Sequence, residues 1–117
     1  MKVKRKPIKQ SSTAPGQEIA SLADLSLDPQ NARKHNDYNL GLIEQSLNEV
    51  GAARSGVIDE TGQLHAGNAT FEALKRTNIK KVKIVDAKGD EWVVVRRTGL
   101  SNDQKKRLAL FDNRTSE

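Results

Sequence analysis

The segment LHAGNATFEALKR, residues 64–76, decides the expected fold of this chain. It starts as the end of a short apolar strand, passes Gly67, and is expected to begin a helix at Asn68. A turn from strand through glycine to helix directs backbone N–H groups outward at the positive end of a helix dipole, which attracts anions. The segment therefore predicts a site for a phosphate group, although the same geometry also serves as a simple chain reversal.

A second helix is expected ahead of this segment. Leu40, Ile43, Leu47 and Val50 recur at helical spacing, and Gly51 follows them as a stop signal. An amphipathic helix is therefore predicted, with this apolar stripe in the core.

Two hairpins are expected from strand-like runs separated by turn residues. Residues 57–58 and 63–66 favour a first hairpin, and residues 82–86 and 91–97 favour a second one. The second hairpin contains Trp92, the single tryptophan, which is expected to lie in the core.

Short local signals predict the remaining elements. Residues 18–26 are expected to be extended, and the helix that begins at Asn68 is expected to end at Asn78, a residue that tolerates a left-handed cap. Ser101 and Gln104 form a capping box for a last helix. Two apolar side chains of that helix should enter the core, Leu108 and Phe111. Helices interleaved with short strands indicate a mixed α/β domain.

The composition limits what the chain can do. Its 117 residues suit a single domain, and only 35% are hydrophobic and 3% aromatic, so the core must be small and aliphatic. The absence of cysteine excludes disulfides and thiolate chemistry. No apolar run is long enough to span a membrane and no signal peptide is recognisable, so we expect a cytoplasmic protein without membrane contact.

The charge is concentrated at the N-terminus. The formal net charge is +5, and residues 1–17 hold five basic residues and no acid, which leaves 15 of each sign elsewhere. The five are Lys2, Lys4, Arg5, Lys6 and Lys9. We predict a disordered basic tail over residues 1–17, which can lie along DNA phosphates or serve only as a solubilising arm. Basic residues also cluster at 80–83, 96–97 and 105–107, and would form a basic face if they converge.

Four short motifs follow one another along the chain. Residues 28–33 fit the pattern DPxNxR, residues 46–51 are close to SIxxxG, residues 67–73 fit the box GxxRxxA except for its arginine, and Asp112–Asn113 form an acidic-Asn pair. In this order they resemble the ParB/sulfiredoxin superfamily, especially the ParB-like domains of phages and mobile elements, some of which are described as nucleases. The resemblance covers residues 18–117 and implies a small α/β domain with a mixed sheet and interleaved helices.

The resemblance implies that the box at Gly67 holds the phosphate of a nucleotide. The backbone N–H groups of Asn68, Ala69 and Thr70 are the expected donors. The family's arginine, which grips that phosphate, is replaced by Thr70, which supplies no charge. Sulfiredoxin activity needs a cysteine in this box, where Ala69 stands, so that activity is excluded.

Other residues are expected to complete this site. Arg54 and Ser55 precede the strand that should face the glycine turn, and can supply the missing charge and a polar contact. Asp112 and Asn113 match the family pair that helps to hold Mg²⁺, so the resemblance implies a nucleoside triphosphate and Mg²⁺ as cofactors. His65 is a candidate general base, and Asp112 a second catalytic residue. Ordinary structural roles also fit each of them.

Three functions fit these observations. The first is a nucleic-acid-associated domain that binds DNA and holds a nucleotide or backbone phosphate at Gly67. The second is a metal-dependent nuclease or nucleotide hydrolase. The third is a protein that binds a protein partner or itself and has lost the chemistry. The threonine at position 70 favours the first or the third. ParB itself reads DNA with a helix-turn-helix that is not evident here, so binding without sequence preference is expected.

Overall fold

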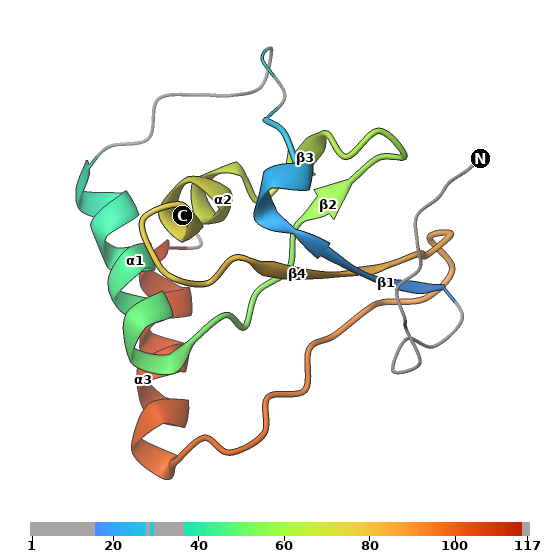
Figure 1. Cartoon of the computed structure of the whole chain (residues 1–117). Helices are drawn as coiled ribbons and strands as arrows, with labels where there is room; N and C mark the ends of the chain where they lie inside the picture. Colours follow the sequence, from blue (N-terminus) through green and yellow to red (C-terminus); the bar gives the residue numbers. More distant parts are fainter. Residues whose placement is uncertain (1–15, 28, 30–36, 116–117) are drawn as a thin grey trace.

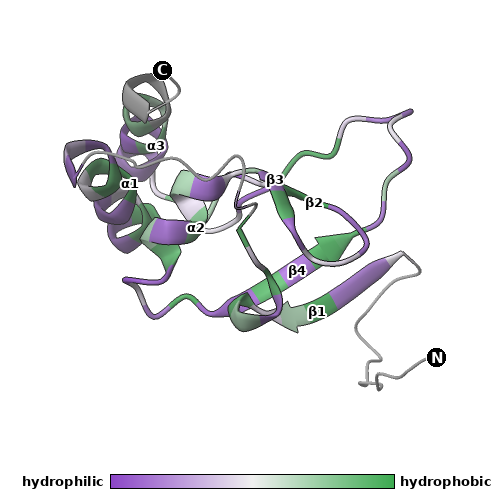
Figure 2. Ribbon diagram, turned by 90° about the horizontal axis from the view of Figure 1, so that it is seen from above, coloured by the Kyte–Doolittle hydropathy of each residue, from purple (hydrophilic) through white to green (hydrophobic). Residues whose placement is uncertain are grey.

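The structure is a computed structural model that describes residues 16–27, 29 and 37–115, with side chains described as far as Phe111. This part of the chain forms three α-helices, one short 3-10 helix and two antiparallel two-stranded sheets (Figure 1). The expected mixed α/β class is confirmed. The helices gather on one side of the molecule and the sheets on the other (Figure 2). Most of the predicted tail and of the DPxNxR motif lies outside the described residues.

The larger sheet joins two strands that are far apart in the sequence. Strand β1 (Gln17–Ser21) pairs with β4 (Lys81–Val85). Ser21 then caps the 3-10 helix η1 (Leu22–Asp24): its hydroxyl accepts the N–H of Ala23 at 3.2 Å, and Asp24 accepts the N–H of Ser21 at 2.9 Å. This capping box ends the strand, so the extended stretch expected over residues 18–26 is interrupted.

The predicted second hairpin is wrong. Strand β4 pairs with β1, whereas residues 91–97 form no strand, and Trp92 is 89% exposed instead of lying in the core. The physical reason lies at Arg97, whose guanidinium donates to the carbonyl oxygens of Val50 and of Ala52, the latter at 3.2 Å. These bonds hold the end of the segment against a helix and away from β4.

The helix α1 (Asp37–Val50) confirms the predicted stripe. Leu40, Ile43, Leu47 and Val50 are buried, and Gly51 ends the helix with a φ of +83°. Burying each such side chain contributes about 1.5–3 kcal/mol, so this face accounts for much of the core energy.

The second helix, α2 (Asn68–Leu74), lies between α1 and the small strands. Its Phe71 packs with Leu22 and Leu64 in one cluster, and its Ala73 packs against α1 in another. The helix ends at Leu74 rather than at Asn78, because the Thr77 hydroxyl donates to the Leu74 carbonyl at 2.9 Å and accepts the N–H of Ile79 at 3.1 Å. This side chain supplies the partners that another helical turn would have supplied.

The smaller sheet is the predicted first hairpin, β2 (Val57–Ile58) with β3 (Leu64–Ala66). Its turn is held by Asp59, one of whose carboxylate oxygens accepts the backbone N–H of Thr61 at 2.9 Å and its hydroxyl at 2.6 Å. Gly62 completes the turn with a φ of +88°. The hairpin is therefore fixed by local turn chemistry.

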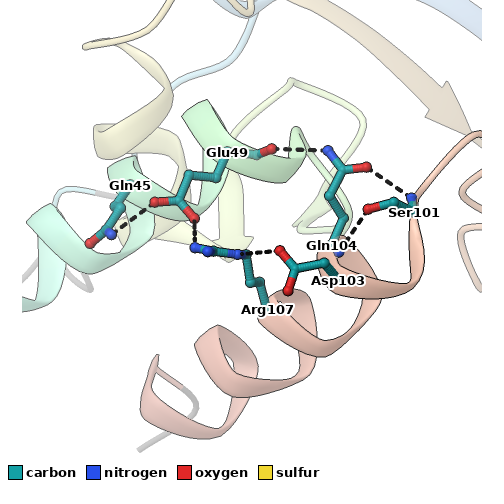
Figure 3. Close-up of polar contacts among 6 residues, drawn as sticks. All are labelled: Gln45, Glu49, Ser101, Asp103, Gln104 and Arg107. Carbon is teal, nitrogen blue, oxygen red and sulfur yellow. Dashed lines mark hydrogen bonds and ion pairs between the residues drawn. The ribbon is translucent and has the colours of Figure 1, made fainter.

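The last helix, α3 (Asn102–Thr115), begins at the predicted capping box. Ser101 and Gln104 exchange hydrogen bonds of 2.9 and 3.1 Å, and Phe111 is buried as expected while Leu108 is half-buried. The helix is tied to α1 through Glu49, which accepts from Arg107 at 2.9 Å (Figure 3). These contacts set α3 beside α1.

Candidate functional site

The turn at Gly67 is the centre of the candidate site. Gly67 has a φ of +94° and a ψ of 20°, and α2 follows directly, as the sequence predicts. A Cβ on Gly67 would lie 3.0 Å from the Cα of Gly56, and a Cβ on Gly56 would lie 2.7 Å from the carbonyl oxygen of Ala66. The backbone before β2 and the backbone after β3 therefore touch, which only glycine permits.

The first turn of α2 presents free backbone donors. No side chain caps it, and within the described part of the chain the N–H groups of Asn68, Ala69 and Thr70 donate no hydrogen bond. The buried Oδ1 of Asn68 also has no hydrogen-bond partner there. Because polar groups removed from water are normally paired, this turn has unused hydrogen-bonding capacity.

Arg54 and Thr70 line one small pocket. The pocket has a volume of about 20 Å³ and lies between α1, α2 and α3, with Ser46 as a third polar neighbour and Leu108 and Phe111 among its apolar walls. This volume has room for about one water molecule and not for a phosphate. An anion would therefore have to sit at the pocket mouth, where the Arg54 side chain is exposed.

The structure brings some of the predicted site residues together. The contact of Gly56 with Gly67 holds the stretch that begins at Arg54 and Ser55 beside the start of α2. Helix α3 reaches the same pocket through Phe111, which directly precedes Asp112. The side chains of Asp112 and Asn113 lie outside the described residues, so their predicted approach to Gly67 stays a prediction.

His65 belongs to a hairpin contact that the sequence analysis missed. Its Nε2 lies 2.8 Å from Asp59 Oδ2, and the other carboxylate oxygen accepts from Thr61 and, at 3.2 Å, from the N–H of Gln63. The hydrogen bond from the Thr61 hydroxyl, followed by that from His65, holds the pKa of Asp59 well below its usual range. Asp59 can therefore orient His65 as well as brace the turn; the pattern Asp-x-Thr in a hairpin turn was the available signal.

Some basic side chains already take part in hydrogen bonds or ion pairs within the structure, and others do not. Arg97 is bound to the end of α1, and Arg107 pairs with Glu49 and Asp103 at 2.9 Å each. Lys81 and Lys83, in contrast, are exposed on β4 and make no ion pair in the region that the structure covers. The five basic residues of the predicted tail lie outside that region.

Two features are absent from the described residues. No three of their His, Asp or Glu side chains converge in a group that could hold a metal ion. None of their helices is long and apolar enough to cross a membrane.

Comparison with protein-family models gives no match. No curated protein and no solved structure matches the chain either. The resemblance in four motifs is therefore carried forward as a hypothesis.

Proposed function

We propose that this chain is a ParB-like, nucleic-acid-associated domain that binds DNA without sequence preference and holds a phosphate group at the Gly67 turn. One observation carries the proposal: Thr70, in the first turn of α2, and Arg54 line the same pocket. A cation and a set of unused N–H donors are the two components that phosphate recognition requires.

The phosphate would bind at the mouth of the pocket. Its oxygens would accept from the N–H groups of residues 68–70 and from the Thr70 hydroxyl, and Arg54 would neutralise part of its charge. Because α2 has only seven residues, the individual N–H groups contribute more than the helix dipole. The phosphate can belong to a nucleoside triphosphate or to a nucleic-acid backbone, since both present the same oxygens.

DNA would bind through side chains that contact phosphates. The tail supplies five basic residues, and Lys81 and Lys83 on β4 are exposed and unpaired among the described groups. Contacts with phosphates carry no sequence information, so affinity should be similar for different duplexes.

Titration with inorganic phosphate and with ATP, each with and without Mg²⁺, tests the phosphate site. We expect Arg54→Ala to weaken binding by about tenfold or more, because a hydrogen bond to a charged group contributes about 1.5–3 kcal/mol. Arg96→Ala removes an exposed arginine elsewhere and should have no effect. Equal losses in both variants, or no binding by the unaltered protein, would contradict the proposal.

A gain of binding provides a second test. Thr70→Arg restores the charge of the family box and should tighten phosphate binding by about tenfold or more. Thr98→Arg adds the same charge at an exposed position and serves as the control. If both variants fold but only Thr98→Arg binds more tightly, the Gly67 turn is not the site.

A metal-dependent nuclease or nucleotide hydrolase is the alternative. It is favoured by Phe111, which lines the pocket of Arg54 and Thr70 and directly precedes Asp112. Such an enzyme would hold Mg²⁺ with Asp112 and Asn113 and use His65 as a base. Cleavage of DNA or ATP that needs Mg²⁺ and is lost in Asp112→Ala would support it over pure binding.

A further inference from the structure

Residues 90–97, DEWVVVRR, form an exposed apolar run between charged ends. Trp92 is 89% exposed, Val94 65%, Val95 50% and Val93 39%. Single exposed apolar residues are common, but four in succession make a contiguous patch of the kind that marks an interaction site.

The backbone of this segment is unpaired as well. Within the described chain, the N–H and C=O groups of residues 91–96 take part in no hydrogen bond. Figure 1 shows the segment leaving the far end of β4 and running alone to α3. Valine and tryptophan favour strands. The segment therefore has the composition of a strand but has no neighbouring strand to pair with.

Exposure alternates along this run, in which all four apolar side chains are exposed. Trp92 and Val94 are the most exposed of the four apolar residues, and Arg96 is exposed as well, whereas Arg97 turns to the end of α1. The even-numbered positions therefore form the more exposed face of this run, as expected of an extended chain. Asp90, Glu91 and Arg96 take part in no ion pair or side-chain hydrogen bond among the described residues.

The order of charges indicates which partner fits this face. Two acids precede the apolar run and two arginines follow it. The charges of this segment therefore match those of a second copy of the segment that runs in the opposite direction. We propose that residues 90–96 are a self-association site, where two copies of the chain pair as antiparallel strands about a two-fold axis at Val93.

In this register, the side chains of the more exposed face meet favourable partners on the second copy. Asp90 lies opposite the partner's Arg96, and Trp92 lies opposite the partner's Val94, so two ion pairs flank an apolar centre. A parallel arrangement would set Asp90 against Asp90 and Arg96 against Arg96, which repel. The contact is isologous, so it closes at the dimer. Its area is that of one strand pair, so the dimer should be weak and dependent on concentration.

Sedimentation velocity of the whole chain, from about 10 µM to about 1 mM, tests the proposal over the range of weak interfaces. We expect a reversible shift from monomer to dimer. The emission of Trp92, the single tryptophan, should move to shorter wavelength over the same range as its ring becomes buried. A monomer at every concentration would overturn the proposal.

Charge reversals identify the paired segment. Asp90→Arg and Arg96→Glu should each weaken self-association by about tenfold or more, because each brings like charges together twice. An equimolar mixture of these two variants should regain dimers, since each unlike pair is then complementary. Lys88→Glu changes an exposed charge outside the strand and should leave the dimer unchanged. No recovery in the mixture, or an equal effect of Lys88→Glu, would overturn the antiparallel pairing.

Discussion

At the scale of single residues, Gly56 and Gly67 decide whether the candidate site can form. The two backbones meet at a distance that leaves no room for a Cβ, and Gly67 also needs a positive φ. The sequence predicted the turn at Gly67 from a strand followed by a helix. Residues 54–55 were expected near this turn, but the backbone contact at Gly56 could not be predicted, because nothing local to Gly56 shows how closely another backbone will approach it.

A matched pair of substitutions separates these two requirements. Gly89 has a φ of +93° with nothing within 4 Å of an added Cβ, so Gly89→Ala bears only the conformational cost of about 1–2 kcal/mol. Gly67→Ala bears that cost and the clash with Gly56 as well, and should lose about 1–3 kcal/mol more. Urea unfolding measures both values. Equal losses would mean that the backbone contact contributes nothing.

At the scale of elements, the sequence predicts what local chemistry fixes and misses what distant contacts decide. The stripe of α1 and the capping box at Ser101 depend on neighbouring residues, and both are confirmed. The end of α2 depends on the Thr77 hydroxyl, which a pattern of apolar residues does not reveal.

Residues 91–97 have the composition of a strand, but composition does not determine which strand a segment pairs with. Arg97 holds the end of this segment against the end of α1 instead.

The β2–β3 hairpin should carry a pH dependence of its own. Hydrogen bonds from Thr61 and His65 lower the pKa of Asp59 in the folded chain, so they stabilise the fold above the ordinary pKa near 4 and this stabilisation declines as the pH falls below it. Asp59→Asn should flatten the decline between about pH 5 and pH 2. Urea unfolding over that range measures it, and Asp86→Asn, at an exposed side chain without a hydrogen bond in the structure, is the control. An unchanged decline in Asp59→Asn would show that other carboxylates cause it.

At the scale of the whole molecule, basic charge is divided unequally between the tail and the folded body. The five basic residues among residues 1–17 make up the entire excess, since the rest of the chain carries 15 charges of each sign. The body should therefore fold without the tail, whereas DNA binding should depend on it.

Salt dependence tests this division. If the tail neutralises about five phosphates, the logarithm of DNA affinity should fall with the logarithm of salt concentration at a slope of roughly −4. Deleting residues 2–15, which stops short of β1 at Gln17, should reduce the slope to no more than the roughly −2 that Lys81 and Lys83 can supply, and leave the melting temperature unchanged. A steep slope that survives the deletion would assign the phosphate contacts to the body, with Lys81 and Lys83 as the first candidates.

The end of α1 has a consequence for how the molecule folds and opens. Here oxygen atoms of Glu49, Val50 and Ala52 accept hydrogen bonds from the C-terminal part of the chain. The donors are the side chains of Arg97, Gln104 and Arg107, and the sequence separations are 45 to 58 residues. Closing such long loops is slow, so α1 and α2 should associate before the C-terminal third docks onto them. In reverse, that third can detach as one cooperative unit while the α1–α2 core persists. Amide hydrogens of α3 should then exchange with solvent together, and sooner than those of α1.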